Sequence, residues 1–89
     1  MLEKQVTIRN KLGLHARAAV KFVNLANRFN SSVKIVKDGN EIDGKSILGI
    51  LTLAATQGSH IRVLVSGKDE KEALGALEGL INNLFDEAE

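Results

Sequence analysis

The dipeptide Asp38-Gly39 lies between two short segments that are predicted to be strands, and it constrains the fold more than any other feature of the chain. Val33 and Ile35 lie on one face of the strand predicted before it, and residues 40–42 form the strand predicted after it. An Asp-Gly pair in this setting is a strong signal for a two-residue hairpin turn. The chain therefore contains at least one pair of antiparallel strands that are joined directly.

The same residues spell a nucleotide-binding motif that the hairpin excludes. The stretch GNEIDGKS, residues 39–46, fits the pattern G-x-x-x-x-G-K-[ST] of a phosphate-binding loop. Such a loop leads from a strand straight into a helix, whereas here a strand is predicted between the two glycines. Glu41 and Asp43 also place carboxylates where phosphates would lie. We interpret the match as coincidental and expect no binding of a nucleoside triphosphate.

Hydrophobic periodicity predicts the other elements. Alternating apolar residues predict a first strand over residues 2–9, which starts late because Lys4 breaks the alternation, and a last strand over residues 61–65. Apolar residues three and four apart predict a helix over residues 16–29, with Asn30 as a left-handed stop. A second helix is predicted over residues 47–57, with Ser46 as its N-cap and Gly58 just after its end.

The last helix is predicted from a capping box and an apolar stripe. Asp69 and Glu72 have the spacing of a capping box, and apolar residues then recur at helical spacing through residue 84. The order β-α-β-β-α-β-α contains no linker or repeat, so we expect a single domain over residues 1–89. The expected fold class is α+β, a four-stranded antiparallel sheet with three helices on one face.

Composition excludes several classes of function. The 89 residues carry a net charge of +1, so bulk attraction to nucleic acid or to an anionic membrane is weak and any anion site must be local. The absence of cysteine leaves no disulfide and no thiolate metal site. We see no signal peptide at the start and no apolar run long enough to span a bilayer. We expect a cytoplasmic protein without a metal or a cofactor.

The segment from Gly13 to Arg17, GLHAR, lies where the first strand gives way to the first helix. Unpaired backbone N–H groups at a helix start favour an anion, and the neutral imidazole of His15 is a competent nucleophile toward phosphorus. Arg17 offers a planar fork of donors to the same phosphate oxygens. Together these residues match a transient phosphoryl acceptor.

Spacing alone leaves a purely structural role for these residues open. A single histidine near a helix start is more often an exposed or capping residue, and an arginine on the first turn is most often only solvated. His60, the other histidine, falls at the start of a distant strand without a carboxylate cluster. We therefore interpret His60 as an exposed structural residue rather than a metal ligand.

The segments GLHARAA (residues 13–19) and GKSILGILTLAATQGS (residues 44–59), with the predicted element order, closely resemble the HPr family, the histidine-containing phosphocarriers of the phosphoenolpyruvate:sugar phosphotransferase system. The resemblance covers essentially the whole chain. It implies an open-faced β-sandwich that receives a phosphoryl group from enzyme I and delivers it to enzyme IIA domains. By position, it implies phosphorylation of His15 on Nδ1 beside Arg17, and modification of Ser46 by a dedicated kinase in some bacteria.

One residue departs from the pattern of that family, which usually reads H-A-R-P-A. This chain has Ala18 where proline is expected. Proline suits the first helical turn because its missing N–H costs nothing there and its φ is preset. Ala18 keeps the helix possible but removes that rigidity, and we still expect phosphoryl transfer.

The second helix carries more apolar residues than one buried face needs. Ile50, Leu53 and Ala54 are predicted to face the core, which leaves an exposed apolar patch near His15. Periodicity alone also allows a fully covered core helix. The resemblance implies that partners dock at this patch. Positive charge suited to acidic partners is expected around it from Lys21, Lys45 and Arg28, although scattered cations are equally typical of a solvated face. The residues expected to contact partners are Ala16, Val20, Lys21, Ile47, Leu48 and Leu51.

Ser46 is predicted to cap the second helix, and phosphorylation would give it a second role. A phosphoryl group at a helix start does not destabilise the helix. It would instead place a dianion among the apolar docking residues and oppose acidic partners. Regulation of docking would therefore require no refolding.

The sequence thus predicts a monomeric phosphocarrier that cycles between His15 and phospho-His15 and is not a turnover enzyme. Its expected partners are enzyme I, enzyme IIA domains and an HPr kinase/phosphorylase, with neither nucleic acid nor membrane among them. Two alternatives stay open: a nitrogen-branch regulatory phosphocarrier, and a regulatory binding module that acts through Ser46 and the apolar patch. An RNA-binding domain is disfavoured because three phenylalanines are the only aromatic residues.

Overall fold

The predicted hairpin is present in the computed structural model, which describes residues 1–87 of the chain. Strands β2 (Ser32–Lys37) and β3 (Asn40–Asp43) pair antiparallel, with Lys37 opposite Asn40. Asp38 and Gly39 between them have φ angles of 51° and 82°. Positive φ at both central residues is what the favoured two-residue hairpin turn requires. A strand therefore follows Gly39 directly, which a phosphate-binding loop does not allow.

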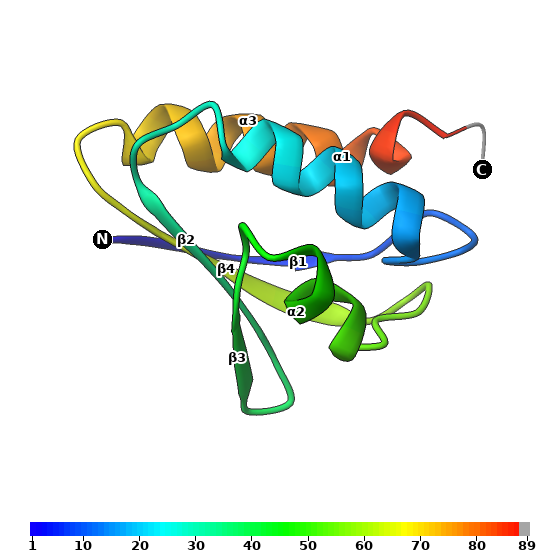
Figure 1. Cartoon of the computed structure of the whole chain (residues 1–89). Coiled ribbons are helices and arrows are strands. Elements are labelled where there is room, and N and C mark those ends of the chain that lie inside the picture. The colour runs from blue at the N-terminus through cyan, green and yellow to red at the C-terminus, as the bar shows by residue number, and fades with distance from the viewer. Residues whose placement is uncertain (88–89) are drawn as a thin grey trace.

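The sheet has four strands in the order β1-β4-β2-β3 (Figure 1). Strand β4 (His60–Ser66) lies between β1 (Leu2–Thr7) and β2. Val6 lies opposite Ile61, and Val33 lies opposite Val65. Every neighbouring pair is antiparallel, which confirms the predicted sheet.

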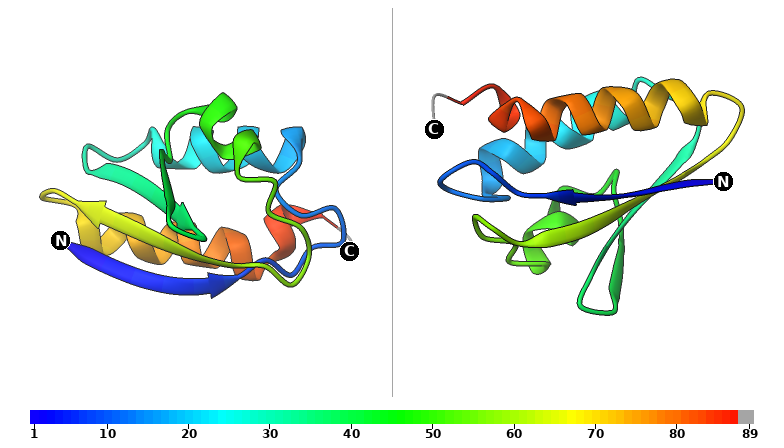
Figure 2. Two further views of the ribbon diagram at one scale, coloured as in Figure 1. Left: turned by 90° about the horizontal axis from the view of Figure 1, so that it is seen from below. Right: turned by 180° about the vertical axis from the view of Figure 1, so that it is seen from behind.

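The helices cover one face of this sheet (Figures 1 and 2). Helix α1 (Ala16–Ala26) packs against α3 (Glu70–Asn82), and the short α2 (Ile47–Thr52) contacts α1 and β3. A 3-10 turn, η1 (Leu84–Asp86), follows α3. The core lies between the helices and the sheet, and its largest fully buried side chains include Phe22, Phe85, Ile8, Ile35, Ile50 and Ile61.

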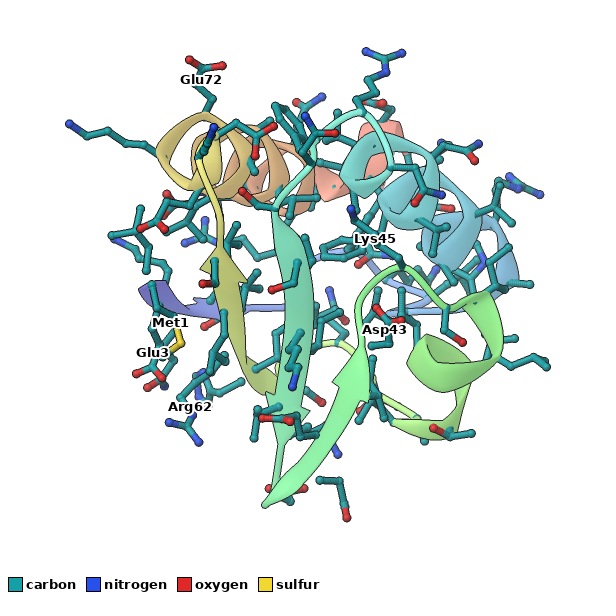
Figure 3. All side chains as sticks on the ribbon, turned by 60° about the vertical axis from the view of Figure 1, so that its left-hand side comes forward. Met1, Glu3, Asp43, Lys45, Arg62 and Glu72 are labelled. Carbon is teal, nitrogen blue, oxygen red and sulfur yellow. The ribbon has the colours of Figure 1, made fainter. Side chains whose placement is uncertain are left out.

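The opposite face of the sheet is mostly polar and carries no helix within residues 1–87, as in an open-faced sandwich, although Val36 is buried on that face and Leu64 is half-buried. Lys34 of β2 and Arg62 of β4 are exposed there. Figure 3 shows Arg62 close to Glu3 of β1, and the Arg62 guanidinium lies 3.3 Å from the Glu3 carboxylate. Such surface pairs contribute little to stability, so the fold depends on the covered face.

Strand β1 begins at Leu2, so the prediction that it starts late was wrong. Lys4 lies on the same face of the strand as the buried Val6, and its Nζ lies 3.5 Å from Glu78 Oε2 on α3. A long lysine stem can cover apolar surface while the ammonium reaches a charged partner. The break in the alternation therefore does not break the strand.

Helices α1 and α2 both end earlier than predicted. Helix α1 ends at Ala26, and the φ angle of Asn30 is not positive. Helix α2 ends at Thr52, and Ala54 has a φ of 50° and is exposed, so its predicted place in the core was wrong. Ala55 is buried instead, and its carbonyl oxygen accepts the Leu14 N–H at 2.9 Å. The turn at Ala54 is what brings this carbonyl to Leu14.

The predicted capping box at the start of α3 was also wrong. The Asp69 carboxylate accepts the N–H groups of Asn30 at 2.8 Å and Ser31 at 2.9 Å, and also the Ser31 hydroxyl. The Ser31 hydroxyl first, and then the Asn30 N–H, hold the pKa of Asp69 below its ordinary value. Asp69 is therefore the anchor of the α1–β2 loop rather than a cap of its own helix.

Candidate functional site

Close backbone contacts set the position at which α1 begins. The Asn10 carbonyl accepts the Gly13 N–H at 3.1 Å, and the Ala55 carbonyl accepts the Leu14 N–H at 2.9 Å. Gly13 has a φ of 69°, and a Cβ at this position would lie 2.4 Å from the Ala55 carbonyl oxygen. Only glycine fits both requirements. The chain before His15 is therefore packed tightly against the segment that follows α2.

His15 is the N-cap residue of α1, yet its side chain does not cap the helix. Its backbone is extended, and its carbonyl accepts the Ala19 N–H at 2.9 Å. Its ring makes no capping hydrogen bond. The N–H groups of the first turn, at Ala16, Arg17 and Ala18, therefore have no partner within the helix. With the helix dipole they favour an anion beside the His15 ring.

The His15 ring is held by Glu87, which sequence reasoning did not identify. His15 Nε2 lies 2.8 Å from Glu87 Oε2, and Glu87 Oε1 accepts a hydrogen bond from Asn10 Nδ2 at 2.8 Å. The same Asn10 nitrogen also donates to the Gly13 carbonyl at 2.7 Å. Within residues 1–87, His15 Nδ1 makes no hydrogen bond. The ring is thus fixed through one nitrogen, and the other has no hydrogen-bond partner among the described residues.

The environment of Glu87 keeps its carboxyl ionised. Burial acts to raise the pKa of Glu87, but hydrogen bonds from Asn10 and His15, together with the charges of His15 and Lys21, hold that pKa below its ordinary value. Exposure of the side chain is 10% for Glu87 and 24% for His15. The carboxylate is therefore nearly enclosed, while the imidazole remains accessible from solvent.

Arg17 lies on the exposed side of the first turn of α1. Within residues 1–87, its guanidinium makes no hydrogen bond or ion pair. A cation without a fixed partner is free to approach an anion that arrives at the helix start. The structure therefore brings Arg17 to the same turn as His15, without a hydrogen bond between their side chains.

The apolar patch predicted on α2 is exposed. Ile47 and Leu51 are exposed, Leu48 retains 76% of its accessible surface, and Ile50 is fully buried as predicted. Val20 on the neighbouring α1 is also exposed, as is Leu12, which was not predicted. Four residues make up the apolar patch: Val20, Ile47, Leu48 and Leu51.

Both lysines that were expected around this patch donate hydrogen bonds to backbone carbonyls. Lys21 Nζ donates to the Phe85 carbonyl at 2.7 Å, and Lys45 Nζ donates to the Phe29 carbonyl at 2.8 Å. Figure 3 shows Lys45 next to Asp43, at the junction of β3 and α2. Arg28 is exposed. Partner contact by Lys21 therefore stays a prediction, because its ammonium already holds the η1 turn.

Ser46 caps α2 as predicted. Its Oγ accepts the Gly49 N–H at 3.0 Å, and its backbone is extended. Its side chain is half-buried next to the exposed Ile47. The start of α2 thus satisfies one of its own N–H groups, which the start of α1 does not.

The second histidine lies apart from this site. His60 is exposed at the start of β4, where its Nδ1 lies 3.0 Å from Thr7 Oγ1. This position agrees with an exposed structural residue. Within residues 1–87, no helix is long and apolar enough to cross a bilayer.

Comparison with known proteins identifies the family. The family model described as "PTS HPr component phosphorylation site" matches residues 2–83. Phosphocarrier protein HPr of Cupriavidus necator is 49% identical over 89 residues, which cover 100% of each chain. Phosphocarrier protein HPr of Pseudomonas aeruginosa is 49% identical over 86 residues, which cover 96% of each chain.

Solved structures agree with these sequences. A crystal structure of HPr from Thermoanaerobacter tengcongensis has a TM-score of 0.96 at 42% identity and covers 100% of both chains. A crystal structure of an HPr dimer from the same organism has a TM-score of 0.79 at 42% identity, covering 98% of this chain and 100% of the other. The chain therefore belongs to the HPr family. Its members are phosphocarriers of the phosphotransferase system, not turnover enzymes.

Proposed function

We propose that His15 accepts a phosphoryl group on Nδ1 from phospho-enzyme I and passes it to enzyme IIA domains. The open start of α1 is the observation that supports this most strongly. The imidazole of His15 is accessible there, and its Nδ1 has no hydrogen bond within residues 1–87. Next to it, three N–H groups at the helix start lack intrahelical partners. Membership of the HPr family supports the same chemistry.

The transfer exchanges one bond to phosphorus for another. The Nδ1 lone pair attacks phosphorus in line, while the bond between phosphorus and the donor atom breaks and its electron pair stays with the donor. The phosphoryl group then carries its charge next to the first-turn N–H groups of α1. Arg17 can turn toward the same oxygens and donate two parallel hydrogen bonds. Delivery to an acceptor is the reverse of this step.

The apolar patch is the surface on which we propose that partners dock. It lies on α2 and on α1, the helix that begins at His15. Exposed apolar clusters on small proteins often mark interfaces. Docking on these helices would bring a partner's reacting atom toward Nδ1, so that the partner supplies most of the positioning. Ala16, which is also exposed, lies next to the histidine and would contact the partner first.

Intact-protein mass spectrometry tests the proposal. The protein is incubated with phosphoenolpyruvate and enzyme I, and we expect a gain of one acid-labile phosphoryl group. His15→Ala should abolish this gain, whereas His60→Ala should retain it. A gain that survives His15→Ala, or the absence of any gain with the enzyme I of the same genome, would contradict the assignment. Comparison of enzyme I proteins from the sugar and nitrogen branches identifies which branch charges His15.

We also propose that phosphorylation of Ser46 by an HPr kinase/phosphorylase regulates docking. The observation that supports this is the position of Ser46, which is half-buried at the start of α2 and borders the apolar patch. Ser46→Asp should weaken binding to enzyme I, measured by calorimetry, with little change in the melting temperature. A Ser46→Asp variant that binds enzyme I as tightly as wild type and is phosphorylated on His15 at the normal rate would contradict this second role.

The remaining expectations concern the setting in which the protein acts. We propose that it acts in the cytoplasm as a monomer. The relatives include an HPr dimer, so the oligomeric state needs a direct measurement. Sedimentation equilibrium over a range of concentrations should give the mass of one chain, and a concentration-dependent dimer would contradict the expectation.

A further inference from the structure

The chain turns back after α3 and brings Glu87 to the start of α1. Leu84, Phe85 and Asp86 have φ angles of 58°, 53° and 61°. Residues other than glycine adopt this left-handed conformation only where their surroundings hold them. Phe85 is fully buried, and its carbonyl accepts a hydrogen bond from Lys21 Nζ at 2.7 Å. These contacts fix the η1 turn, and Glu87 follows it directly.

The Glu87 carboxylate receives a different donor on each of its oxygens. Asn10 Nδ2 donates to Oε1 at 2.8 Å, and His15 Nε2 lies 2.8 Å from Oε2. Asn10 is fully buried and also donates to the Gly13 carbonyl, so its position is set by the chain before the helix. An ionised carboxylate only accepts hydrogen bonds, so the proton between Glu87 and His15 belongs to Nε2.

We propose that Glu87 is a positioning residue for phosphoryl transfer, whose carboxylate holds the His15 proton on Nε2 and leaves the lone pair on Nδ1. The inference rests on the proposed function and deepens it. When Nδ1 attacks, its bond to phosphorus forms, the donor's bond to phosphorus breaks, and the electron pair of that bond leaves with the donor. Nε2 keeps its proton throughout, so the ring becomes cationic. The carboxylate, 2.8 Å from Nε2, lies next to this developing charge.

Glu87→Gln separates this role from simple packing. A glutamine side chain has the same shape, but one end accepts hydrogen bonds and the other end only donates them. It therefore cannot accept from both Asn10 and His15. If its amide donates to Nε2, the ring proton must move to Nδ1. Glu72→Gln is the matched control, because Glu72 is exposed on α3 and Figure 3 shows it projecting away from the fold.

Nitrogen-15 NMR of the unphosphorylated protein measures the tautomer directly. At about pH 8.5, two units above the ordinary imidazole pKa of about 6.5, the ring shifts report which nitrogen carries the proton. We expect the proton of neutral His15 to be mainly on Nε2. Glu87→Gln should shift it substantially toward Nδ1, whereas Glu72→Gln should not, and the His60 signals should stay constant in both. Wild-type protein with the proton mainly on Nδ1, or a tautomer ratio unchanged by Glu87→Gln, would overturn the proposal.

Transfer kinetics provide the second readout. With phospho-enzyme I as donor, Glu87→Gln should accept the phosphoryl group at least about 10-fold more slowly than wild type, the lower end of the loss seen when a carboxylate that orients a metal-bound histidine is removed. Glu72→Gln should react at the wild-type rate. Equal rates for wild type and Glu87→Gln would also overturn the proposal. If enzyme I fails to charge even the wild-type protein, the proposed function fails, and the tautomer measurement still decides the role of Glu87.

Discussion

Helices α1 and α2 begin in the same way but satisfy their first turns differently. Each starts from an extended N-cap residue, and the carbonyls of His15 and Ser46 accept N–H groups from Ala19 at 2.9 Å and Ile50 at 3.0 Å. The Ser46 side chain then caps its own helix through the Gly49 N–H. The His15 side chain does not, because its ring is turned to Glu87 instead.

This difference separates a structural helix start from one that is suited to chemistry. An N–H group bonded to a cap cannot also bind an arriving anion, whereas unpaired N–H groups can. The α1 start has such groups, a ring nitrogen without a partner and an unpaired Arg17 within residues 1–87. The α2 start has a capped first turn and an exposed apolar surface, which fits docking and regulation.

The largest expected effect on stability comes from disrupting the packing of the segment just before α1. Gly13→Ala would place a Cβ 2.4 Å from the Ala55 carbonyl oxygen at a φ of 69°. We expect it to lower the free energy of unfolding by roughly 2–4 kcal/mol, measured in urea. Gly58→Ala is the control, because Gly58 has a φ of 90° but no atom within 4 Å of the added Cβ. It should cost only about 1–2 kcal/mol, and equal losses for the two variants would contradict the close packing at Gly13.

The start of α3, at Asp69, adds a helix start whose contribution to stability depends on pH. The hydrogen bonds to its carboxylate hold the pKa of Asp69 below its ordinary value, so the folded state binds the proton less readily than the unfolded state. The stabilisation is therefore complete above about pH 4 and is lost as the pH falls through the lower folded-state pKa. Asp69→Asn should melt at a lower temperature than wild type at pH 7. The two melting curves should converge in acid, and a difference independent of pH would contradict this explanation.

A smaller effect is expected from removing the cap of α2. Ser46→Ala deletes the hydrogen bond to the Gly49 N–H, and loss of such a cap typically costs about 1 kcal/mol. Urea denaturation measures this loss. Ser59→Ala is the control, because Ser59 lies just before β4 and does not cap a helix. Phosphorylation of His15 should proceed at the normal rate, because the α1 start is unaffected. A slowed transfer would show that the two helix starts are not independent.

The smallest effect is expected at Ala18. Ala18→Pro removes an N–H that has no intrahelical partner and restricts the unfolded chain, so stability should rise by about 0.4–1 kcal/mol. Differential scanning calorimetry measures the change in the melting temperature. A loss of stability would instead show that the Ala18 N–H, or the space around this fully buried residue, is already used in the free protein.

Local sequence signals predicted most of the fold, and long-range contacts account for what they missed. Asp38-Gly39 and the alternating strands predicted the antiparallel sheet, and Ser46 was correctly predicted as a cap. The early end of α2 depends on the contact between Ala55 and Leu14, which no local pattern reports. Asp69 has the spacing of a capping box, but a loop distant in sequence takes its carboxylate.

The candidate site shows the same limit. His15 and Arg17 are adjacent to a helix start in the sequence, so their chemistry could be inferred from type and spacing. Glu87 is separated from His15 by 72 residues, and only the left-handed η1 turn brings the two together. Asn10 looks like an ordinary loop residue until its burial and its bond to Glu87 are known.

The most direct test of the central claim is NMR of the phosphorylated protein. We expect phosphorus on Nδ1 of His15, a proton retained on Nε2, and downfield shifts of the amide protons at residues 16–18. The amide signals at residues 47–49, at the capped start of α2, should stay essentially unchanged. Phosphorus on Nε2, or amide protons of α1 that do not respond to it, would contradict the claim that the open start of α1 receives the phosphoryl group.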